Sequence, residues 1–206
     1  MRTLVIETAT AACSVALIDG PALIAERHAE VGRGHAEHLL PMIADLPEGG
    51  RAPAILVDCG PGSFTGIRVG LAAARALAFG WGASLGGFSA LPLIAVASFA
   101  DHPLWPRVAI VMEGGHGEVF VQRFANPLAA EGLAASLLPE AALALVGDDP
   151  VVGSGRRWLM AFAPGLAGHE RLPRAADARR LSPQWTTLPP HPAYGRAPDA
   201  KPLAAA

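Results

Sequence analysis

The chain has 206 residues, of which 51% are hydrophobic and 17% are charged, and its formal net charge is −2. This length suits one large domain or two small lobes, and the apolar fraction is sufficient for a sizeable core. The slightly negative charge argues against a stand-alone nucleic-acid-binding protein, which normally carries a basic patch.

The N-terminal residues indicate a soluble protein. An acidic residue at position 7 makes the opening run a predicted strand and not a signal peptide. No apolar run reaches the 18 residues of a membrane span, so we expect a cytoplasmic location without membrane contact. Cys13 and Cys59 lie inside apolar runs and are predicted to be buried, reduced thiols, and no C-x-x-C motif is present for zinc or redox chemistry.

Apolar runs at residues 3–8, 13–18 and 22–29 are separated by tight turns and predict an antiparallel meander of three strands. Residues 35–46 then show apolar side chains at helical spacing, with Pro41 inside the predicted helix.

Two histidines of this helix, His35 and His38, are spaced to share one helix face. A metal site needs more ligands than two, so we expect no metal there and interpret these residues as exposed or interface histidines.

The segment 58–81 organises the rest of the chain. It follows a predicted strand at 54–57 and contains a Gly-Pro-Gly turn at 60–62, and a helical pattern begins at Gly66. Ser63 or Thr65 is expected to cap the helix, because either hydroxyl can accept from N–H groups of the first turn.

Three interpretations of this segment stay open. The turn formed by Gly60, Gly62, Ser63 and Thr65 can cradle a phosphate, although the residues of a P-loop and the spacing of a dinucleotide fingerprint are absent. It can also be a tight turn that leads into a buried helix. Alternatively, the small residues of the helix allow a helix of a partner chain to approach closely.

A short strand at 83–85, a turn at Gly86-Gly87 and a helix capped by Ser89 are expected next, and the first lobe is predicted to end at residue 103. Strands at 107–112 and 117–124 predict a hairpin.

The tip of this hairpin carries Glu113, His116 and Glu118, which can be an acid–base pair or an ordinary polar tip. A helix at 139–145, a strand at 150–153 and a helix at 156–162 complete a smaller second lobe, predicted as residues 104–188.

Residues 189–206 form a proline-rich tail that we expect to be extended and weakly ordered. No catalytic constellation emerges: Ser63 is not in a G-x-S-x-G motif, and no histidine can be tied to a nucleophile by its spacing. The residues alone therefore indicate an α/β protein that is more plausibly a binding partner than a self-sufficient enzyme.

Several blocks together resemble one family. They are L-V-I-E-T-A-T-A-A-C-S-V-A-L at the start, H-A-E-H-L-L-P-M-I, G-P-G-S-F-T-G-I-R-V-G-L-A-A-A-R-A-L-A, G-E-V-F after the hairpin and P-A-Y-G-R near the end. The chain resembles the TsaB (YeaZ) family. Its members work with TsaD to make N6-threonylcarbamoyladenosine at position 37 of tRNAs that read A-starting codons.

The resemblance implies an actin-like, Hsp70-like ATPase fold with two lobes of ribonuclease-H type, the second one reduced. It also implies a non-catalytic scaffold that docks on TsaD through two helices of the first lobe. The residues expected at this interface are His35, His38, Leu39, Met42, Ile43, Gly66, Arg68, Gly70, Leu71, Ala74 and Arg75.

Further expectations follow from the same resemblance. A third member, the ATPase TsaE, joins the pair, tRNA is met through the complex, and the chain forms a homodimer when it is alone. ATP or ADP and metal belong to the partner subunits, since residues 88–95 offer no His, Cys or carboxylate where the catalytic relative holds its metal.

Departures from the family pattern are Glu7 in place of Asp, Gly115 in place of the hairpin Arg, and Tyr194-Gly195-Arg196 in place of Y-L-R. The alternative function is a stand-alone nucleotide-binding ATPase of the same superfamily, suggested by the Gly-rich turn and Glu7.

Overall fold

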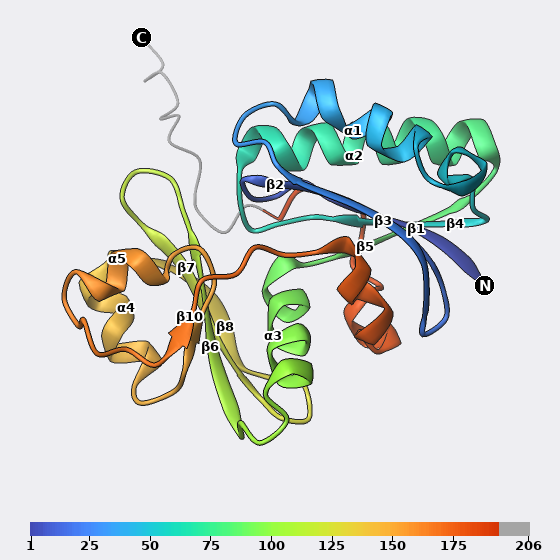
Figure 1. The fold of residues 1–206 in the computed structure, drawn as a ribbon. Coiled ribbons are helices and arrows are strands. Elements are labelled where there is room, and N and C mark those ends of the chain that lie inside the picture. Colours follow the sequence, from blue (N-terminus) through green and yellow to red (C-terminus); the bar gives the residue numbers. More distant parts are fainter. Residues whose placement is uncertain (194–206) are drawn as a thin grey trace, which may run out of the picture.

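The computed structural model describes residues 1–193 as two lobes, each built on a five-stranded sheet (Figure 1). The strand order is β3-β2-β1-β4-β5 in the first sheet and β8-β7-β6-β9-β10 in the second. In each sheet three strands form an antiparallel meander and two further strands join it in parallel. The second lobe therefore repeats the strand plan of the first, and the two-lobed α/β fold expected from the resemblance is confirmed.

The first lobe contains strands β1 (Arg2–Glu7), β2 (Ala12–Asp19), β3 (Ala22–Glu30), β4 (Ala54–Asp58) and β5 (Ser84–Phe88), helices α1 (His35–Ala44), α2 (Phe64–Trp81) and α3 (Ala90–Asp101), and the 3₁₀ helix η1 (Pro47–Gly50). The second sheet and the segment that follows it contain β6 (Arg107–Glu113), β7 (Val119–Ala125), β8 (Ala129–Leu137), β9 (Val151–Val152), β10 (Gly168–His169), α4 (Pro139–Val146), α5 (Arg156–Met160), and the 3₁₀ helices η2 (Ala175–Arg180) and η3 (Pro183–Trp185).

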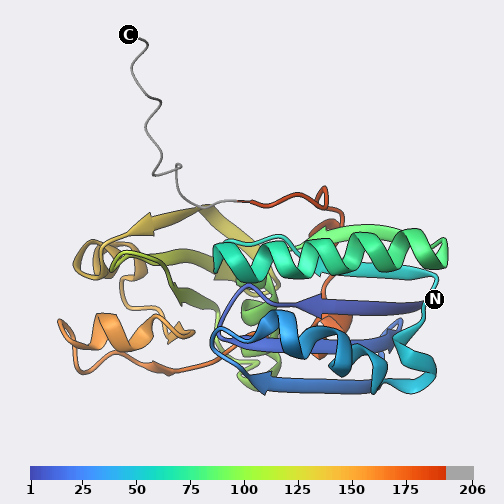
Figure 2. The ribbon, with the colours of Figure 1, turned by 90° about the horizontal axis from the view of Figure 1, so that it is seen from above.

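Helices α1 and α2 lie side by side over one face of the first sheet (Figures 1 and 2). Side chains alternate between the faces of a strand, so Leu4 and Ile6 of β1 point to the same side. They pack there with Leu39 of α1 and with Ile67 and Leu71 of α2. The other side of both helices faces away from the sheet.

The opposite face of this sheet is covered by the C-terminal segment and by α3. Val5 and Phe88 pack there with Leu93 of α3 and with Ala175 and Ala176 of η2. The chain therefore returns to the first lobe after the second sheet is complete. The division into residues 1–103, 104–188 and 189–206 stays a proposal. In the returning segment, η2 packs on the first lobe, and Trp185 of η3 packs on Phe124 of the second.

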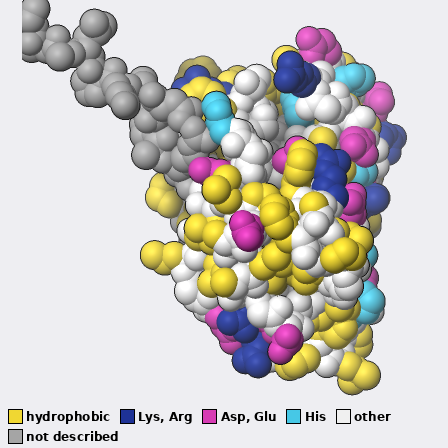
Figure 3. All heavy atoms as spheres, turned by 90° about the vertical axis from the view of Figure 1, so that its left-hand side faces the viewer, with side chains coloured by type: hydrophobic (Ala, Val, Ile, Leu, Met, Phe, Trp, Pro, Cys, Tyr) yellow, Lys and Arg dark blue, Asp and Glu magenta, His cyan; other side chains and the backbone are white. Residues whose placement is uncertain are grey.

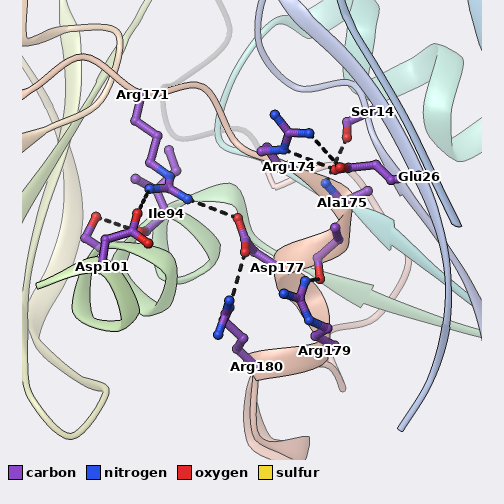
Figure 4. A network of polar contacts seen from close by, with 12 residues as sticks. Ser14, Glu26, Ile94, Asp101, Arg171, Arg174, Ala175, Asp177, Arg179 and Arg180 are labelled. Atoms are coloured by element: carbon purple, nitrogen blue, oxygen red, sulfur yellow. Dashed lines mark hydrogen bonds and ion pairs between the residues drawn. The ribbon is translucent and has the colours of Figure 1, made fainter. Parts of the chain in front are cut away.

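Arginines fix this returning segment to both of its neighbours (Figure 4). Arg171 contacts Asp101 at the end of α3 and Asp177 of η2. Arg174 donates hydrogen bonds to Glu26 of β3. The buried Ser14 hydroxyl accepts a 2.9 Å hydrogen bond from the Ala175 N–H, which joins η2 to the centre of the sheet.

The second lobe is smaller because its own helices are short. Val108, Ile110 and Phe124 of its sheet pack on Ile94 of α3, which thus serves both lobes. On the other face α4 and α5 have only 8 and 5 residues. Among the described residues, none of the helices is both long and apolar enough to cross a membrane.

Three local predictions differ from the structure. Gly86 and Gly87 belong to β5 and not to a turn, because they pair in parallel with Leu56 and Val57 of β4. Gly87 also exchanges backbone hydrogen bonds with Leu188, and a Cβ at Gly87 would lie 2.8 Å from the Leu188 carbonyl oxygen. Strand β8 was not predicted, since its alanine-rich sequence has no apolar alternation. Residues 189–193 are held in place, with the Ala193 N–H bonded to the Cys59 carbonyl at 2.7 Å, and 194–206 lie outside the described residues.

Candidate functional site

The Gly-rich turn between β4 and α2 is pressed against the turn between β1 and β2. Gly60 has a φ of 102°, a conformation that favours glycine. A Cβ at Gly62 would lie 2.1 Å from the carbonyl oxygen of Ala9, so only glycine fits at this position. The glycines of the turn therefore allow two segments of the same chain to meet closely.

Three N–H groups of this turn and of the start of α2 donate to the chain itself. The Gly60 N–H donates to Asp58 Oδ1 at 2.7 Å, and the Ser63 N–H donates to the Ala9 carbonyl at 2.7 Å. The Ser63 hydroxyl accepts the Gly66 N–H at 3.2 Å, so Ser63 is the N-cap and Thr65 is not. The four residues predicted as a phosphate loop are close together, but these donors already have partners.

Two fully buried carboxyl groups lie beneath the turn. Glu7 ends β1 and Asp58 ends β4, and both residues have 0% exposure. Burial, followed by the charge of Asp58, raises the pKa of Glu7 well above its usual range. Burial also raises the pKa of Asp58. Negative charge at this place disfavours a bound phosphate.

Glu7 lies inside the strand predicted over residues 3–8, and its pairing with Asp58 was not predicted. Each of the two acidic residues stands near the carboxyl end of a predicted strand, and the carboxyl ends of neighbouring parallel strands meet at the same edge of a sheet. Predicting their contact also required the knowledge that β1 and β4 are adjacent.

The small-residue face of α2 packs inside the chain. A Cβ at Gly66 would lie 2.0 Å from the Thr8 carbonyl oxygen, and a Cβ at Gly70 would lie 2.3 Å from Thr8 Oγ1. Ala74 has 0% exposure. Close approach of a partner helix was therefore the wrong explanation for these small residues, because the end of β1 occupies that space.

Other predicted interface residues are also buried. His35 is 4% exposed, and its Nε2 lies 3.0 Å from the Ala12 carbonyl oxygen, so it is not an exposed histidine. The remaining buried members of the predicted set are Leu39, Ile43 and Leu71. Whether the two helices bind a partner is a separate matter that stays a prediction.

The outer face of the two helices consists of other side chains and carries apolar groups. His38, Arg68 and Arg75 are exposed and Met42 is half-buried, as an interface requires. The same two helices carry three exposed apolar side chains outside the predicted interface set: Leu40, Phe64 and Phe79, with exposures of 53%, 51% and 93%. Arg75 also donates a 2.7 Å hydrogen bond to the Pro190 carbonyl oxygen. We call the side chains of α1 and α2 that do not face the sheet, namely His38, Leu40, Met42, Phe64, Arg68, Arg75 and Phe79, together the outer helical face.

The two carboxylates of the hairpin tip bind to other elements of the second lobe. Glu113 forms an ion pair with Arg157 of α5, and Glu118 accepts a 2.6 Å hydrogen bond from Ser136 of β8. His116 is exposed. Each carboxylate thus has its own partner on a different element.

A second exposed apolar surface lies on the small lobe. Figure 3 shows hydrophobic side chains gathered on the side of the molecule where α4 and α5 lie in Figure 1. The large exposed members on these elements and their flanks are Leu138, Leu145, Trp158 and Phe162. In the described part of the chain, residues 1–193, no three His, Cys, Asp or Glu side chains are grouped so that they could hold a metal ion.

Comparison with known proteins adds a family and a fold. The family model described as TsaD, tRNA N6-adenosine threonylcarbamoyltransferase, matches residues 27–132. An uncharacterized protein of Mycobacterium bovis is 31% identical over 221 aligned positions, covering 98% of this chain and 94% of that protein. The Escherichia coli tRNA threonylcarbamoyladenosine biosynthesis protein TsaB is 37% identical over 126 positions, which cover 58% of this chain and 53% of TsaB.

Among solved structures, YeaZ from Pseudomonas aeruginosa superposes with a TM-score of 0.70 at 27% identity. The superposition covers 85% of this chain and 87% of that protein. The similarity in fold thus extends over both lobes, whereas the similarity to the curated TsaB sequence spans about half of its length.

Proposed function

The chain belongs to the family described by the TsaD model, in its TsaB (YeaZ) branch, and from this premise we propose that it serves tRNA threonylcarbamoyladenosine biosynthesis as a non-catalytic subunit that binds a TsaD-type enzyme. The observation that carries the proposal is the outer helical face. It combines exposed phenylalanine, leucine and arginine side chains on two adjacent helices, a composition that favours protein–protein contact.

The position of this surface supports docking. Helices α1 and α2 cover one face of the first sheet, and the second lobe does not cover these helices (Figure 2). A partner can therefore reach both helices together. The side chains that point inward, such as Leu39 and Leu71, hold the two helices on the sheet. The surface is therefore presented by a rigid platform.

The Gly-rich turn supports a non-catalytic role. Its N–H donors bind Asp58, Ala9 and Ser63 of the same chain, and two buried carboxyl groups lie beneath it. A nucleotide phosphate at this turn would have to displace these contacts and approach negative charge. The alternative of a stand-alone ATPase is not favoured by the comparisons either.

The wider assembly is part of the same proposal. We place the chain in the cytoplasm, where tRNA is met through the complex, and expect a TsaE-type ATPase to join the pair. The nucleotide and the metal are expected on the partner subunits. In the absence of its partner, the chain is expected to form a homodimer through the same outer helical face.

The test is co-purification with the TsaD-type subunit of the same organism. We compare the wild type with Leu40→Glu and Phe79→Glu, which place a charge on the outer helical face. Leu133→Glu is the matched control, because Leu133 of β8 is 91% exposed and lies on the second lobe. Loss of apolar contact and burial of an unpaired charge should weaken binding by roughly tenfold or more for the first two variants and leave the control unchanged.

Equal binding by all three variants would place the interface on another surface. Absence of a complex with the wild type, or full tRNA modification by the partner alone, would contradict the proposed subunit role itself.

A further inference from the structure

We propose that Glu7 and Asp58 hold one proton between them, and that this shared proton ties the end of β1 to the Gly-rich turn that begins α2. The proposal concerns the interior of the first lobe and does not rest on the proposed function. It assigns a proton-binding site to two residues that no docking role uses.

The two carboxyl groups are neighbours because of the strand register. Ile6 of β1 pairs with Val57 of the parallel strand β4, so the next residues along each strand are Glu7 and Asp58. One oxygen of each group has a backbone donor: Glu7 Oε1 accepts the Ala9 N–H and Asp58 Oδ1 accepts the Gly60 N–H, both at 2.7 Å.

The second oxygen of each carboxyl group is the unusual feature. Glu7 Oε2 and Asp58 Oδ2 are buried, and no N–H or O–H group of the described residues reaches either atom in normal hydrogen-bond geometry. A buried acceptor without a donor is costly. A proton on one carboxyl group removes this cost, because Glu7 can then donate to Asp58.

The charges around the pair lead to the same conclusion. Neither carboxyl group forms an ion pair with an Arg, a Lys or a His among residues 1–193. The titratable groups that face the pair are the thiols of Cys13 from β2 and Cys59 from the turn, whose pKa values the carboxyl charges help to raise. The positive charge of Arg75 of α2 partly offsets the rise in the pKa of Cys59. Nε2 of His35 of α1 lies within hydrogen-bond distance of the Ala12 carbonyl oxygen.

Two adjacent negative charges without a counter-ion are strongly unfavourable in a protein interior. Burial, followed by the charge of Asp58, raises the pKa of Glu7 well above its usual range. Burial also raises the pKa of Asp58, to about 6, and the backbone hydrogen bond from Gly60 limits that rise. Glu7 is therefore the residue that keeps the proton, and Asp58 is the acceptor.

The direction of the pH effect follows from linkage. The folded protein keeps a proton that an unfolded Glu releases above its ordinary pKa of 4.5. The contribution to stability is thus complete below that pH and is lost as the pH rises toward the folded pKa. Between about pH 6, above which Asp58 has lost its own proton, and the folded pKa of Glu7, the unfolding equilibrium constant should rise by about tenfold for each pH unit.

The experiment measures urea unfolding between about pH 5 and pH 9. Glu7→Gln replaces the proton by a permanent amide donor to Asp58, so this variant should fold and lose the slope that Glu7 contributes. Asp58→Asn supplies the donor from the other side and should do the same. Glu30→Gln is the matched control, because it removes an exposed carboxylate of the same sheet and should keep the wild-type slope.

A second readout does not depend on the variants being equally stable. The infrared spectrum of the native wild type at neutral pH should contain a protonated-carboxyl band, and Glu7→Gln should lack it. Parallel pH profiles for the wild type and Glu7→Gln, together with no such band in the wild type, would overturn the proposal.

Discussion

The hydroxyl of Thr8 donates a 2.8 Å hydrogen bond to the carbonyl oxygen of Gly66, and this contact joins the end of β1 to the first turn of α2. Both residues are buried. The helix can approach Thr8 this closely only because Gly66 and Gly70 have no side chains. The contact explains why a run of small residues is required on the inner side of α2.

Gly66→Ala should therefore destabilise the protein. The added methyl group would collide with the Thr8 carbonyl, and overpacking of this kind costs about 1–3 kcal/mol of unfolding free energy. Urea unfolding measures the change. Gly80→Ala is the matched control in the same helix: nothing lies within 4 Å of its Cβ, so the higher helix propensity of alanine should stabilise by up to about 1 kcal/mol. Similar losses for both variants would contradict this explanation.

Ser63→Ala should weaken the start of α2. The Ser63 hydroxyl accepts the Gly66 N–H, and loss of an N-cap typically costs about 1 kcal/mol. Thr65→Ala removes an exposed hydroxyl that does not cap the helix and should change the unfolding free energy by less than about half of that. Thermal unfolding of both variants checks the assignment, and a larger effect at Thr65 would reverse it.

Arg171→Met should loosen the returning C-terminal segment. It removes one of the two ion pairs of Asp177, which is 7% exposed, and leaves Arg180 as the remaining partner, so weaker compensation of this buried charge is expected to cost about 2 kcal/mol. Arg180→Met is the control, because Arg180 is more exposed than Arg171 and, among residues 1–193, forms an ion pair with Asp177 alone. Equal losses in urea unfolding would show that Arg171 has no special part in the network of Figure 4.

The same variant should change the response to acid. Arg171 lowers the pKa of Asp101, so this pair contributes stability at neutral pH that is lost as the pH falls through the folded pKa of Asp101. The wild type should therefore lose more stability between about pH 5 and pH 2 than Arg171→Met does. Identical acid profiles would contradict a native Arg171–Asp101 interaction.

The two cysteines should be unreactive in the folded protein. Burial raises the pKa of Cys13 to about 11 and that of Cys59 to about 12, so little thiolate forms at pH 8. A thiol reagent at that pH should modify neither residue until urea unfolds the chain, and it should then modify both. Rapid modification of either thiol without urea would show that the core opens there.

Sequence patterns predicted the first lobe well because its elements follow simple periodicities. The three meander strands, the helix predicted over 35–46 and the Ser89-capped helix are present, although the first of these helices ends at Ala44. In the second lobe, the hairpin around 113–118 is present as well. Glycine was harder to interpret, because the same residue type serves in the turn at Gly60 and inside strand β5 at Gly87. The second case is decided by the parallel pairing of Gly87 with Val57 of β4 and by the approach of Leu188, a residue 101 positions later.

Surface and interior were also harder to separate on α2. A stripe of Gly and Ala reads equally well as a face for a partner helix and as a face for the chain's own strand. The contact with Thr8 resolves this ambiguity, and it depends on how β1 and α2 are placed in three dimensions. The pairing of Glu7 with Asp58 has the same origin.

The repeated strand plan has a consequence for the C-terminal ends of β1 and β6. Glu7 and Glu113 are the last residues of corresponding strands, and each is followed by a hairpin turn. One is sealed in the interior beside Asp58, and the other faces solvent in an ion pair with Arg157. The molecule thus contains its own comparison: a glutamate at the corresponding position of each sheet is shielded from water in one lobe and exposed to water in the other.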